Sequence, residues 1–222
     1  MKIKSGLLWF CALVLTVFLS LTTFNLPAHA FSSSDYDHLL QTNECNGCDL
    51  TGADLSGKDL YGSVLIGADL SGADLSDSLL IEAKLAGANL TGANLSYAEL
   101  SGVKLSDADL TGADLSDAKL SNAEMDHATL SEAILTAADL EGAILIEADL
   151  IGAIAQSANF DQAILSGSNL SSADFEGSSM RDITLSNAIL TEANFSVVDL
   201  FRARMPNDTI YRGDVSKFGA YQ

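Results

Sequence analysis

The stretch Ala53-Asp54-Leu55-Ser56-Gly57 is one copy of a five-residue unit that repeats without an insertion through most of the chain. Ala68-Asp69-Leu70-Ser71-Gly72 and Ala113-Asp114-Leu115-Ser116-Asp117 are further copies. From Leu50 to Met205 every fifth residue is apolar, at all 32 steps, and 25 of these residues are Leu. A small residue stands two positions earlier, and it is Ala at 23 steps. This unbroken register decides the fold.

A period of five excludes the two regular structures that most often bury apolar residues. An α-helix turns about 100° per residue, so residues five apart do not form one stripe. A flat strand alternates its faces every two residues, so successive Leu residues would point to opposite faces. The Ala and Leu positions both stay inside only if the chain bends once per unit, with the polar residues at the corner. The sequence therefore predicts a solenoid.

The units resemble those of the pentapeptide-repeat family over residues 45–205. The resemblance implies an all-β fold, a right-handed quadrilateral β-helix with four units per coil. Residues twenty apart would then stack in columns. At a strand spacing of roughly 4.8 Å, about eight coils would form a rod about 38 Å long. Each buried Leu contributes roughly 1.5–3 kcal/mol, so neighbouring coils stabilise one another.

Residues 1–30 differ from the repeats. Lys2 and Lys4 precede an apolar run from Leu7 to Leu21, and Ala28-His29-Ala30 supplies the small residues that signal peptidase prefers. We expect a signal peptide, and no membrane segment after its cleavage. The alternative is a membrane anchor, but the apolar run is shorter than the ~20 residues that a span prefers.

Short segments flank the repeats on both sides. Within residues 31–44 the sequence predicts a cap helix at 34–40, with Ser34 as its N-cap and an acidic first turn. Residues 206–222 would form a C-terminal cap or tail, because Pro206 ends the periodicity. Three aromatic residues could cover the last coil: Tyr211, Phe218 and Tyr221.

The chain is strongly acidic. Its formal net charge is −19, and removal of Lys2 and Lys4 with the signal peptide takes it to −21. A basic patch for nucleic acid is absent from the sequence, and anionic membrane surfaces would repel the mature chain. We therefore expect neither nucleic acid nor membrane as a partner.

Two cysteines frame the entry into the repeats, in Cys45-Asn46-Gly47-Cys48-Asp49-Leu50. Both occupy inward positions, so their side chains should lie close together. They are either two small buried hydrophobic residues or a disulfide, which export would favour. A redox-active pair lacks a thioredoxin-like setting, and a zinc site lacks a second pair of ligands.

Lys58 stands at an inward position where Ala is usual. An unpaired ammonium in the core is costly. We expect the side chain to reach toward the N-terminal cap and to meet Glu44 or Asp37.

The sequence contains no catalytic constellation. His38 lies in the expected cap and His127 at an outward corner, where both would be solvated. An interior filled with Leu leaves no pocket for a substrate. We therefore expect no enzyme activity, no cofactor and no metal site.

Four units per coil would sort the outward residues that precede each Leu into columns. Two adjacent columns are acidic. The first contains Asp49, Asp69, Asn89, Asp109, Thr129, Asp149, Asn169 and Ile189. The second contains Asp54, Asp74, Asn94, Asp114, Ile134, Ile154, Asp174 and Asn194. These columns are either solvated faces or surfaces for calcium binding or phosphate mimicry.

Apolar residues replace the polar outward residues within about two coils. They are Ile134, Ile144, Ile146, Ile151, Ile154 and Ile164, which we call the isoleucine belt. Asp139, Glu141, Glu147 and Asp149 border the belt. An apolar surface with a charged rim is typical of a contact surface, which here would suit a hetero-partner carrying basic residues. Strand propensity is the alternative explanation, and a homodimer is possible but not indicated.

Two functions are compatible with these features. The entry Cys45–Leu50 after a helix and a signal peptide resembles that of family members from cyanobacterial periplasm or thylakoid lumen. This resemblance implies a non-enzymatic interaction rod with a protein partner in an exported compartment. The alternative is a DNA mimic that inhibits a type II topoisomerase, as some cytosolic members of the family do. The acidity of this chain favours the role of a DNA mimic, and its expected signal peptide opposes that role.

Overall fold

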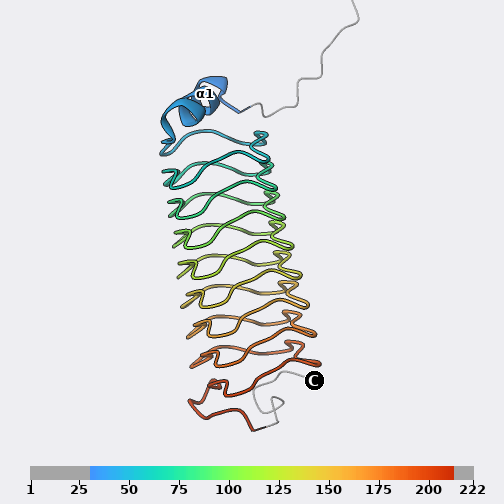
Figure 1. Ribbon diagram of the computed structural model, residues 1–222. Coiled ribbons are helices and arrows are strands. Elements are labelled where there is room, and N and C mark those ends of the chain that lie inside the picture. The colour runs from blue at the N-terminus through green and yellow to red at the C-terminus, as the bar shows by residue number, and fades with distance from the viewer. Residues whose placement is uncertain (1–30, 213–222) are drawn as a thin grey trace, which may run out of the picture. The chain divides into compact units, whose positions relative to one another are not determined.

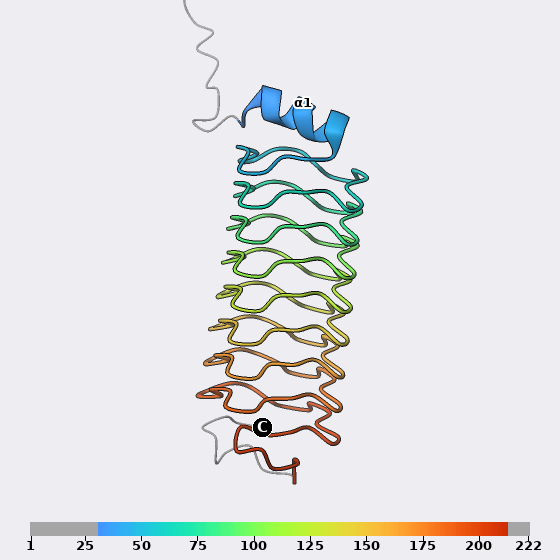
Figure 2. The same cartoon turned by 90° about the vertical axis from the view of Figure 1, so that its left-hand side faces the viewer.

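The computed structural model describes residues 31–212, which lie in a compact unit that begins at Phe31. Figures 1 and 2 show helix α1 (Ser33–Thr42) across the N-terminal end of a stack of coils. The signal peptide expected at residues 1–30 lies outside the described residues. So do Phe218 and Tyr221 of the expected C-terminal cap.

The coils are joined by single parallel β-bridges, one for each five-residue unit. Each bridge within the stack joins a residue to the one twenty positions later, as Asp49 to Asp69 and Thr184 to Arg204. A coil therefore closes after four units, and the described repeats form a parallel β-helix. Columns of outward residues follow directly from this register.

Three backbone hydrogen bonds between coils and one turn define each unit, and the Gly72 amide supplies one of the three by donating to the Thr91 carbonyl at 2.9 Å. The Leu70 amide donates to the Asn89 carbonyl at 2.7 Å, and the Asn89 amide donates back to the Ala68 carbonyl at 2.9 Å. The Ala73 amide closes the corner by donating to the Leu70 carbonyl at 3.0 Å. Among the inward residues, the Leu amide thus joins neighbouring coils, and the Ala amide closes the corner.

The second corner residue has a positive φ in every unit from residue 47 to residue 202. Glycine adopts this left-handed conformation without a steric penalty, and Asn or Asp tolerates it. This requirement explains Gly72, with a φ of 63°, and Asp77, with a φ of 56°. Val197 adopts a φ of 60° although its branched Cβ disfavours that conformation.

The core is a continuous column of Leu and Ala, most of them with 0 or 1% of their surface exposed. Near the C-terminal end three phenylalanines replace Leu and stack on one another. The Phe175 ring centroid lies 5.6 Å from that of Phe160 and 5.4 Å from that of Phe195. Inward serines at Ala positions are mostly satisfied locally, as Ser78 donates to the Leu75 carbonyl at 2.6 Å.

Helix α1 begins two residues earlier than the sequence suggests. Its N-cap is Ser32, whose hydroxyl accepts from the Asp35 amide at 3.3 Å, so the prediction of Ser34 as the N-cap was wrong. The helix ends where Asn43 adopts a left-handed φ of 60° and donates its amide to the Leu39 carbonyl. Ser34 lies within the first turn because an earlier serine was available for the cap.

The first coil has no coil before it, so some of its backbone groups lack a partner from a neighbouring coil. Residues of α1 and its N-cap supply partners for several of these groups. The Asp49 amide donates to the Asp35 carboxylate at 3.0 Å, and the Asp49 carbonyl accepts from the Ser32 amide at 3.0 Å. The Tyr36 hydroxyl donates to the Asp54 carbonyl at 3.1 Å. The cap therefore removes hydrogen-bonding groups that could pair with another chain's strand.

At the other end the chain turns back after Pro206. Arg204 and Ile210 form an antiparallel bridge, and the Tyr211 amide donates to the Ala203 carbonyl at 2.8 Å. Tyr211 is partly buried against the core. One of the three aromatic residues expected at this end therefore packs there.

Ala155 and Phe175 provide a test of core volume. Ala155 is the one Ala among the 32 Leu-type positions, and Phe175 occupies the same column one coil later. The Ala155 amide donates to the Asp174 carbonyl at 2.7 Å, which fixes that register. A small residue beside a large one keeps the interior closely packed.

We predict that Ala155→Leu lowers the free energy of unfolding by about 1–3 kcal/mol through overpacking, although it restores the usual residue of the repeat. The double variant Ala155→Leu/Phe175→Leu should recover most of this loss. Thermal unfolding followed by circular dichroism measures both effects. A single variant as stable as the wild type would show that these two positions do not share volume.

Candidate interaction surface

The described residues carry their polar chemistry on the outside of the β-helix. Pockets of about 260 and 350 Å³ lie toward the C-terminal end. The smaller is lined by Asp182, Ile183, Thr184, Arg202, Arg204 and Ile210. Its charged groups already have partners, since Arg202 Nε lies 2.9 Å from Asp182 Oδ1. The core residue Ile183 contributes to the lining of this pocket, and the larger pocket is lined by Gln156, Ser157, Glu176, Gly177 and Val197.

Within residues 31–212 no group of three or more His, Cys, Asp and Glu side chains is placed to hold a metal ion. His127 is exposed, and its Nδ1 lies 3.5 Å from a carboxylate oxygen of Glu147. The helix of the described part is too short to cross a membrane.

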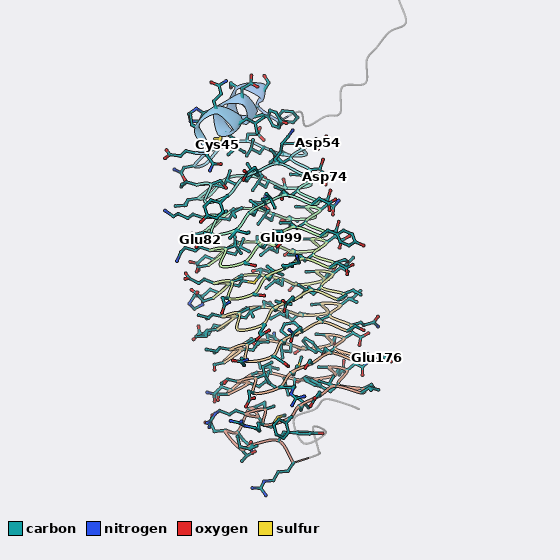
Figure 3. All side chains as sticks on the ribbon, viewed as in Figure 1. Cys45, Asp54, Asp74, Glu82, Glu99 and Glu176 are labelled. Carbon is teal, nitrogen blue, oxygen red and sulfur yellow. A yellow bond between two sulfur atoms is a disulfide. The ribbon has the colours of Figure 1, made fainter. Side chains whose placement is uncertain are left out.

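The carboxylates of the acidic columns accept hydrogen bonds from the corner residues that follow them. Asp74 Oδ1 accepts from the Ser76 amide at 3.0 Å and from the Ser76 hydroxyl at 2.7 Å. The Asn94 side-chain amide donates to the same oxygen at 3.1 Å. Figure 3 labels Asp54 and Asp74, which follow one another along this column. An Asn between Asp residues thus replaces carboxylate repulsion with a hydrogen bond between coils.

Hydrogen bonding within the corners also favours the ionised form of two carboxylates. The Thr111 hydroxyl lowers the pKa of Asp109 below its usual value. The Ser56 hydroxyl does the same to the pKa of Asp54, and the charge of Lys58 adds a smaller effect. These carboxylates are occupied by neighbours in the same chain, which supports a structural role for the columns.

Lys58 does not make the contact expected from the sequence. Among the described residues no ion pair joins its ammonium to Glu44 or Asp37, so that prediction was wrong. The side chain is only half-buried and acts on Asp54 in the neighbouring unit. The cap satisfies backbone groups instead, and the lysine reaches solvent beside it.

The residues of the isoleucine belt lie in two different columns and at the corners between them. Ile134 bridges to Ile154, and Ile144 bridges to Ile164. The two pairs lie two units apart, on opposite sides of a coil that has four units. The exposed fractions of Ile146, Ile151 and Ile154 are 37, 39 and 41%. A flat partner could therefore contact one half of the belt, and a partner would have to curve around the coils to contact both.

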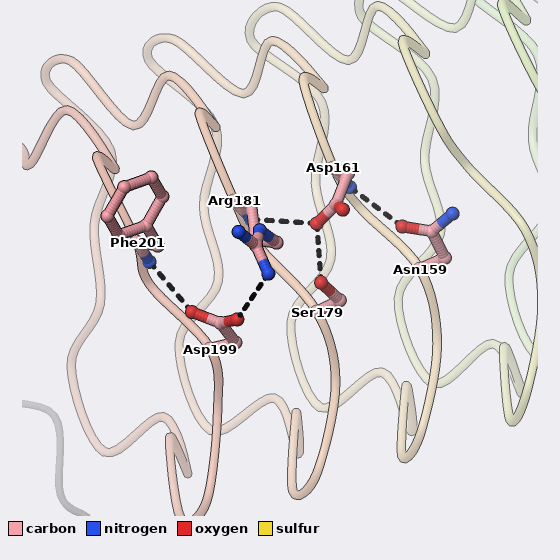
Figure 4. A network of polar contacts seen from close by, with 6 residues as sticks. All are labelled: Asn159, Asp161, Ser179, Arg181, Asp199 and Phe201. Carbon is pink, nitrogen blue, oxygen red and sulfur yellow. Dashed lines mark hydrogen bonds and ion pairs between the residues drawn. The ribbon is translucent and has the colours of Figure 1, made fainter.

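A polar network near the C-terminal end was not foreseen from the sequence. Figure 4 shows Arg181 between two carboxylates, with its amide donating to Asp161 at 2.8 Å and its guanidinium to Asp199 at 3.3 Å. The guanidinium also lies 5.2 Å from the centroid of the Phe201 ring. The Ser179 hydroxyl donates to Asp161 at 2.5 Å. This network joins three successive coils, so it stabilises their stacking.

A group of apolar residues near the N-terminal end, three of them exposed and Ile81 half-buried, was likewise not foreseen from the sequence. It consists of Tyr61, Leu79, Ile81 and Tyr97, which we call the tyrosine–leucine patch. Tyr61, Leu79 and Tyr97 are 55, 41 and 59% exposed. They occupy three different positions of the repeat, so no column in the sequence reveals them together.

Cys45 and Cys48 form a disulfide, with their Cα atoms 5.4 Å apart. Cys45 belongs to the core, and Cys48 packs against it. The Cys45 sulfur lies 3.3 Å from the Asp35 carbonyl oxygen, a contact without a donated hydrogen because the bonded sulfur carries none. The disulfide therefore lies directly between helix α1 and the first coil.

Comparison with known proteins identifies the repeat. The family model for pentapeptide repeats matches eight copies. The matched residues are 44–80, 74–112, 108–145, 143–182 and 178–207. No curated protein sequence matches the chain.

Several solved structures are similar to this chain. One is HetL, a pentapeptide repeat protein involved in heterocyst differentiation regulation in the cyanobacterium Nostoc sp. strain PCC 7120. HetL is 27% identical to this chain, and the match covers 82% of this chain and 100% of HetL, with a TM-score of 0.41. QnrB1, a plasmid-mediated fluoroquinolone resistance protein, is 23% identical over 74% of this chain and 90% of its own, with a TM-score of 0.45. A pentapeptide repeat protein from the thylakoid lumen of Arabidopsis thaliana is 23% identical. The match covers 69% of this chain and 70% of that protein, with a TM-score of 0.18.

We predict that Cys45 and Cys48 are bonded in the protein isolated from its native compartment. Alkylation without reduction, followed by mass spectrometry, should leave both residues unmodified. Closing so short a loop contributes at most about 2 kcal/mol by chain entropy. Cys48→Ala should therefore loosen α1 without unfolding the coils, seen as faster hydrogen exchange in the helix alone. Two alkylated thiols in the untreated protein would contradict the prediction.

Proposed function

This chain belongs to the pentapeptide repeat family, and on that premise we propose that it is a non-enzymatic interaction rod of an exported compartment. Its partner is a protein that binds to the outer faces of the β-helix. The observation that carries the proposal is the filled interior: Leu and Ala occupy the inward positions of every coil, nearly without exposure. Binding energy for a partner can then come only from side chains that depart from the repeat on the outside.

We also propose a quadrilateral cross-section for the right-handed β-helix that family membership implies. Four units close each coil, since bridges join residues twenty apart. Each unit has one corner at which the second residue has positive φ. Four corners per coil support four flat sides, which present four outer faces to partners.

Export is part of the proposal. It is supported by the apolar run from Leu7 to Leu21 and by Ala28-His29-Ala30, features that are typical of a cleaved signal peptide. We predict a mature protein in the periplasm or the thylakoid lumen whose N-terminal residue is Phe31. Fractionation of the native cells and sequencing of the mature N-terminus test this. Recovery of an uncleaved protein from the cytosol would contradict it.

A DNA mimic of a type II topoisomerase is the second candidate. The observation that favours it is the net charge of −19 together with two adjacent acidic columns. Against it, corner hydrogen bonds and interleaved Asn side chains occupy the carboxylates of these columns. The location of the mature protein separates the two candidates, because a mimic has to meet its enzyme in the cytosol.

The isoleucine belt is our first choice for the partner surface. Isolated exposed hydrophobic residues are common, but this group combines exposed Ile146, Ile151 and Ile154 with two bridged pairs. Acidic residues border it, so the partner would carry basic residues around an apolar strip. Two copies of this chain would bring like charges together.

We predict that Ile144→Asp/Ile164→Asp reduces the amount of partner captured from the native compartment at least tenfold, because two carboxylates would be buried in the contact. Circular dichroism first confirms that the fold is retained. Thr184→Asp is the matched control, since it adds charge to the same column outside the belt. The pair Ile134→Asp/Ile154→Asp tests the opposite half. If neither pair changes the captured proteins, the belt is not the site.

A further inference from the structure

The tyrosine–leucine patch gathers on one side of the first three coils. Leu79 bridges to Glu99, which lies two residues after Tyr97, and Asp59 bridges to Leu79 and lies two residues before Tyr61. Ile81 stands one coil below Tyr61 at the same corner position. Neighbouring coils are about 4.8 Å apart, so these side chains lie within reach of one another. Leu79 on the face therefore lies one coil from Tyr61 at one corner and one coil from Tyr97 at the other.

One aromatic ring of the patch is held in place. The Tyr61 hydroxyl donates to Glu82 at 3.2 Å, and the charge of this carboxylate, followed by the hydrogen bond, raises the pKa of Tyr61 above its usual value. A ring that is already fixed loses less conformational entropy when a partner covers it. Tyrosine is also among the residues that contribute most to protein interfaces.

The other aromatic ring is held at a cost to the backbone. Tyr97 has a φ of 60° at the corner position where Gly57 stands two coils earlier and Asp77 one coil earlier. A bulky residue in this conformation costs on the order of 1 kcal/mol or more. Its ring is nevertheless 59% exposed, so it gains little from packing within the chain. Tyr97 therefore exposes an aromatic side chain at a corner position where the repeat often has Gly or Asp.

The rim of the patch is acidic. Asp59, Asp77 and Glu82 are exposed around it. Glu99 is also at the rim, but Lys119 already forms an ion pair with it. Among the described ion pairs none neutralises Asp59, Asp77 or Glu82. The patch thus presents apolar and aromatic surface beside three carboxylates that no described ion pair neutralises.

We propose that the tyrosine–leucine patch binds a basic segment of a partner protein. Apolar or aromatic side chains of the segment cover Leu79 and the two tyrosines, and its Lys or Arg residues pair with the rim carboxylates. The proposal rests on the proposed function in one respect, that the outer faces bind protein, and it concerns a surface separate from the isoleucine belt. A second copy of this chain is a poor occupant, because its own rim would repel.

The test uses the mature protein purified from its native compartment and two labelled probes. One is the heptapeptide Lys-Leu-Lys-Phe-Lys-Leu-Lys and the other is heptalysine, both amidated, with binding followed by fluorescence anisotropy at 0.15 M salt. We expect the apolar probe to bind at least tenfold more tightly than heptalysine. The variant Leu79→Asn/Tyr97→Gly should abolish that difference.

Both substitutions restore residues that the repeat uses at these positions, and Tyr97→Gly removes a strained conformation. The variant should therefore melt no lower than the wild type, so a loss of binding reports the surface and not the fold. Thr184→Asp, which lies outside both the patch and the isoleucine belt, is the control and should leave the affinity for the apolar probe unchanged.

Three results would overturn the inference. Equal affinity for both probes would show attraction by charge alone. Unchanged binding by Leu79→Asn/Tyr97→Gly would place the contact elsewhere. If Ile144→Asp/Ile164→Asp lost binding instead, the proposed function would stand without this patch. A concentration-dependent dimer, found by light scattering in the wild type and lost in the variant, would make a second copy the occupant.

Discussion

The hydrogen bonds between coils are the constraint on which the structure depends. Each inward Leu amide has to meet the carbonyl nineteen residues later, and the outward residue of the next coil donates back. A single inserted residue would break this register for all coils beyond it and move Leu out of the core. The chain therefore keeps a strict period from residue 50 to residue 205, with the volume of Ala155 balanced by Phe175 instead of by a change in length.

The same constraint moves function to the outside. A coil whose inward positions are filled with Leu and Ala has no interior left for a ligand, and its corners consume many of the Asp carboxylates in turns. Only departures from the repeat remain available to a partner. Some of these departures stabilise the stack, as the polar network around Arg181 does. Others leave apolar surface exposed, as the isoleucine belt and the tyrosine–leucine patch do.

The two ends of the stack illustrate how such a rod is closed. At the N-terminal end α1 covers the first coil, the disulfide lies beside it, and groups of the cap satisfy the backbone of Asp49, which makes this edge less available to a further strand. At the C-terminal end the described chain turns back and pairs Arg204 with Ile210 on one side. Val197 is 85% exposed close to this end, in a conformation that a β-branched residue avoids.

The sequence by itself determined the solenoid, its limits, the inward residues and the presence of a cap helix, because a fixed period repeats one local rule at every unit. It also brought Cys45 and Cys48 together, because both are inward and one unit apart. It misjudged Ser34 and Lys58, whose partners depend on how the cap lies on the first coil. The column model with four units per coil already placed the two Ile pairs of the belt on opposite sides, and the bridges agree with it. Only the tertiary structure decided that Tyr61, Leu79 and Tyr97 are exposed on neighbouring coils. Such contacts join different positions of the repeat on different coils, and their exposure depends on side-chain packing that periodicity does not encode.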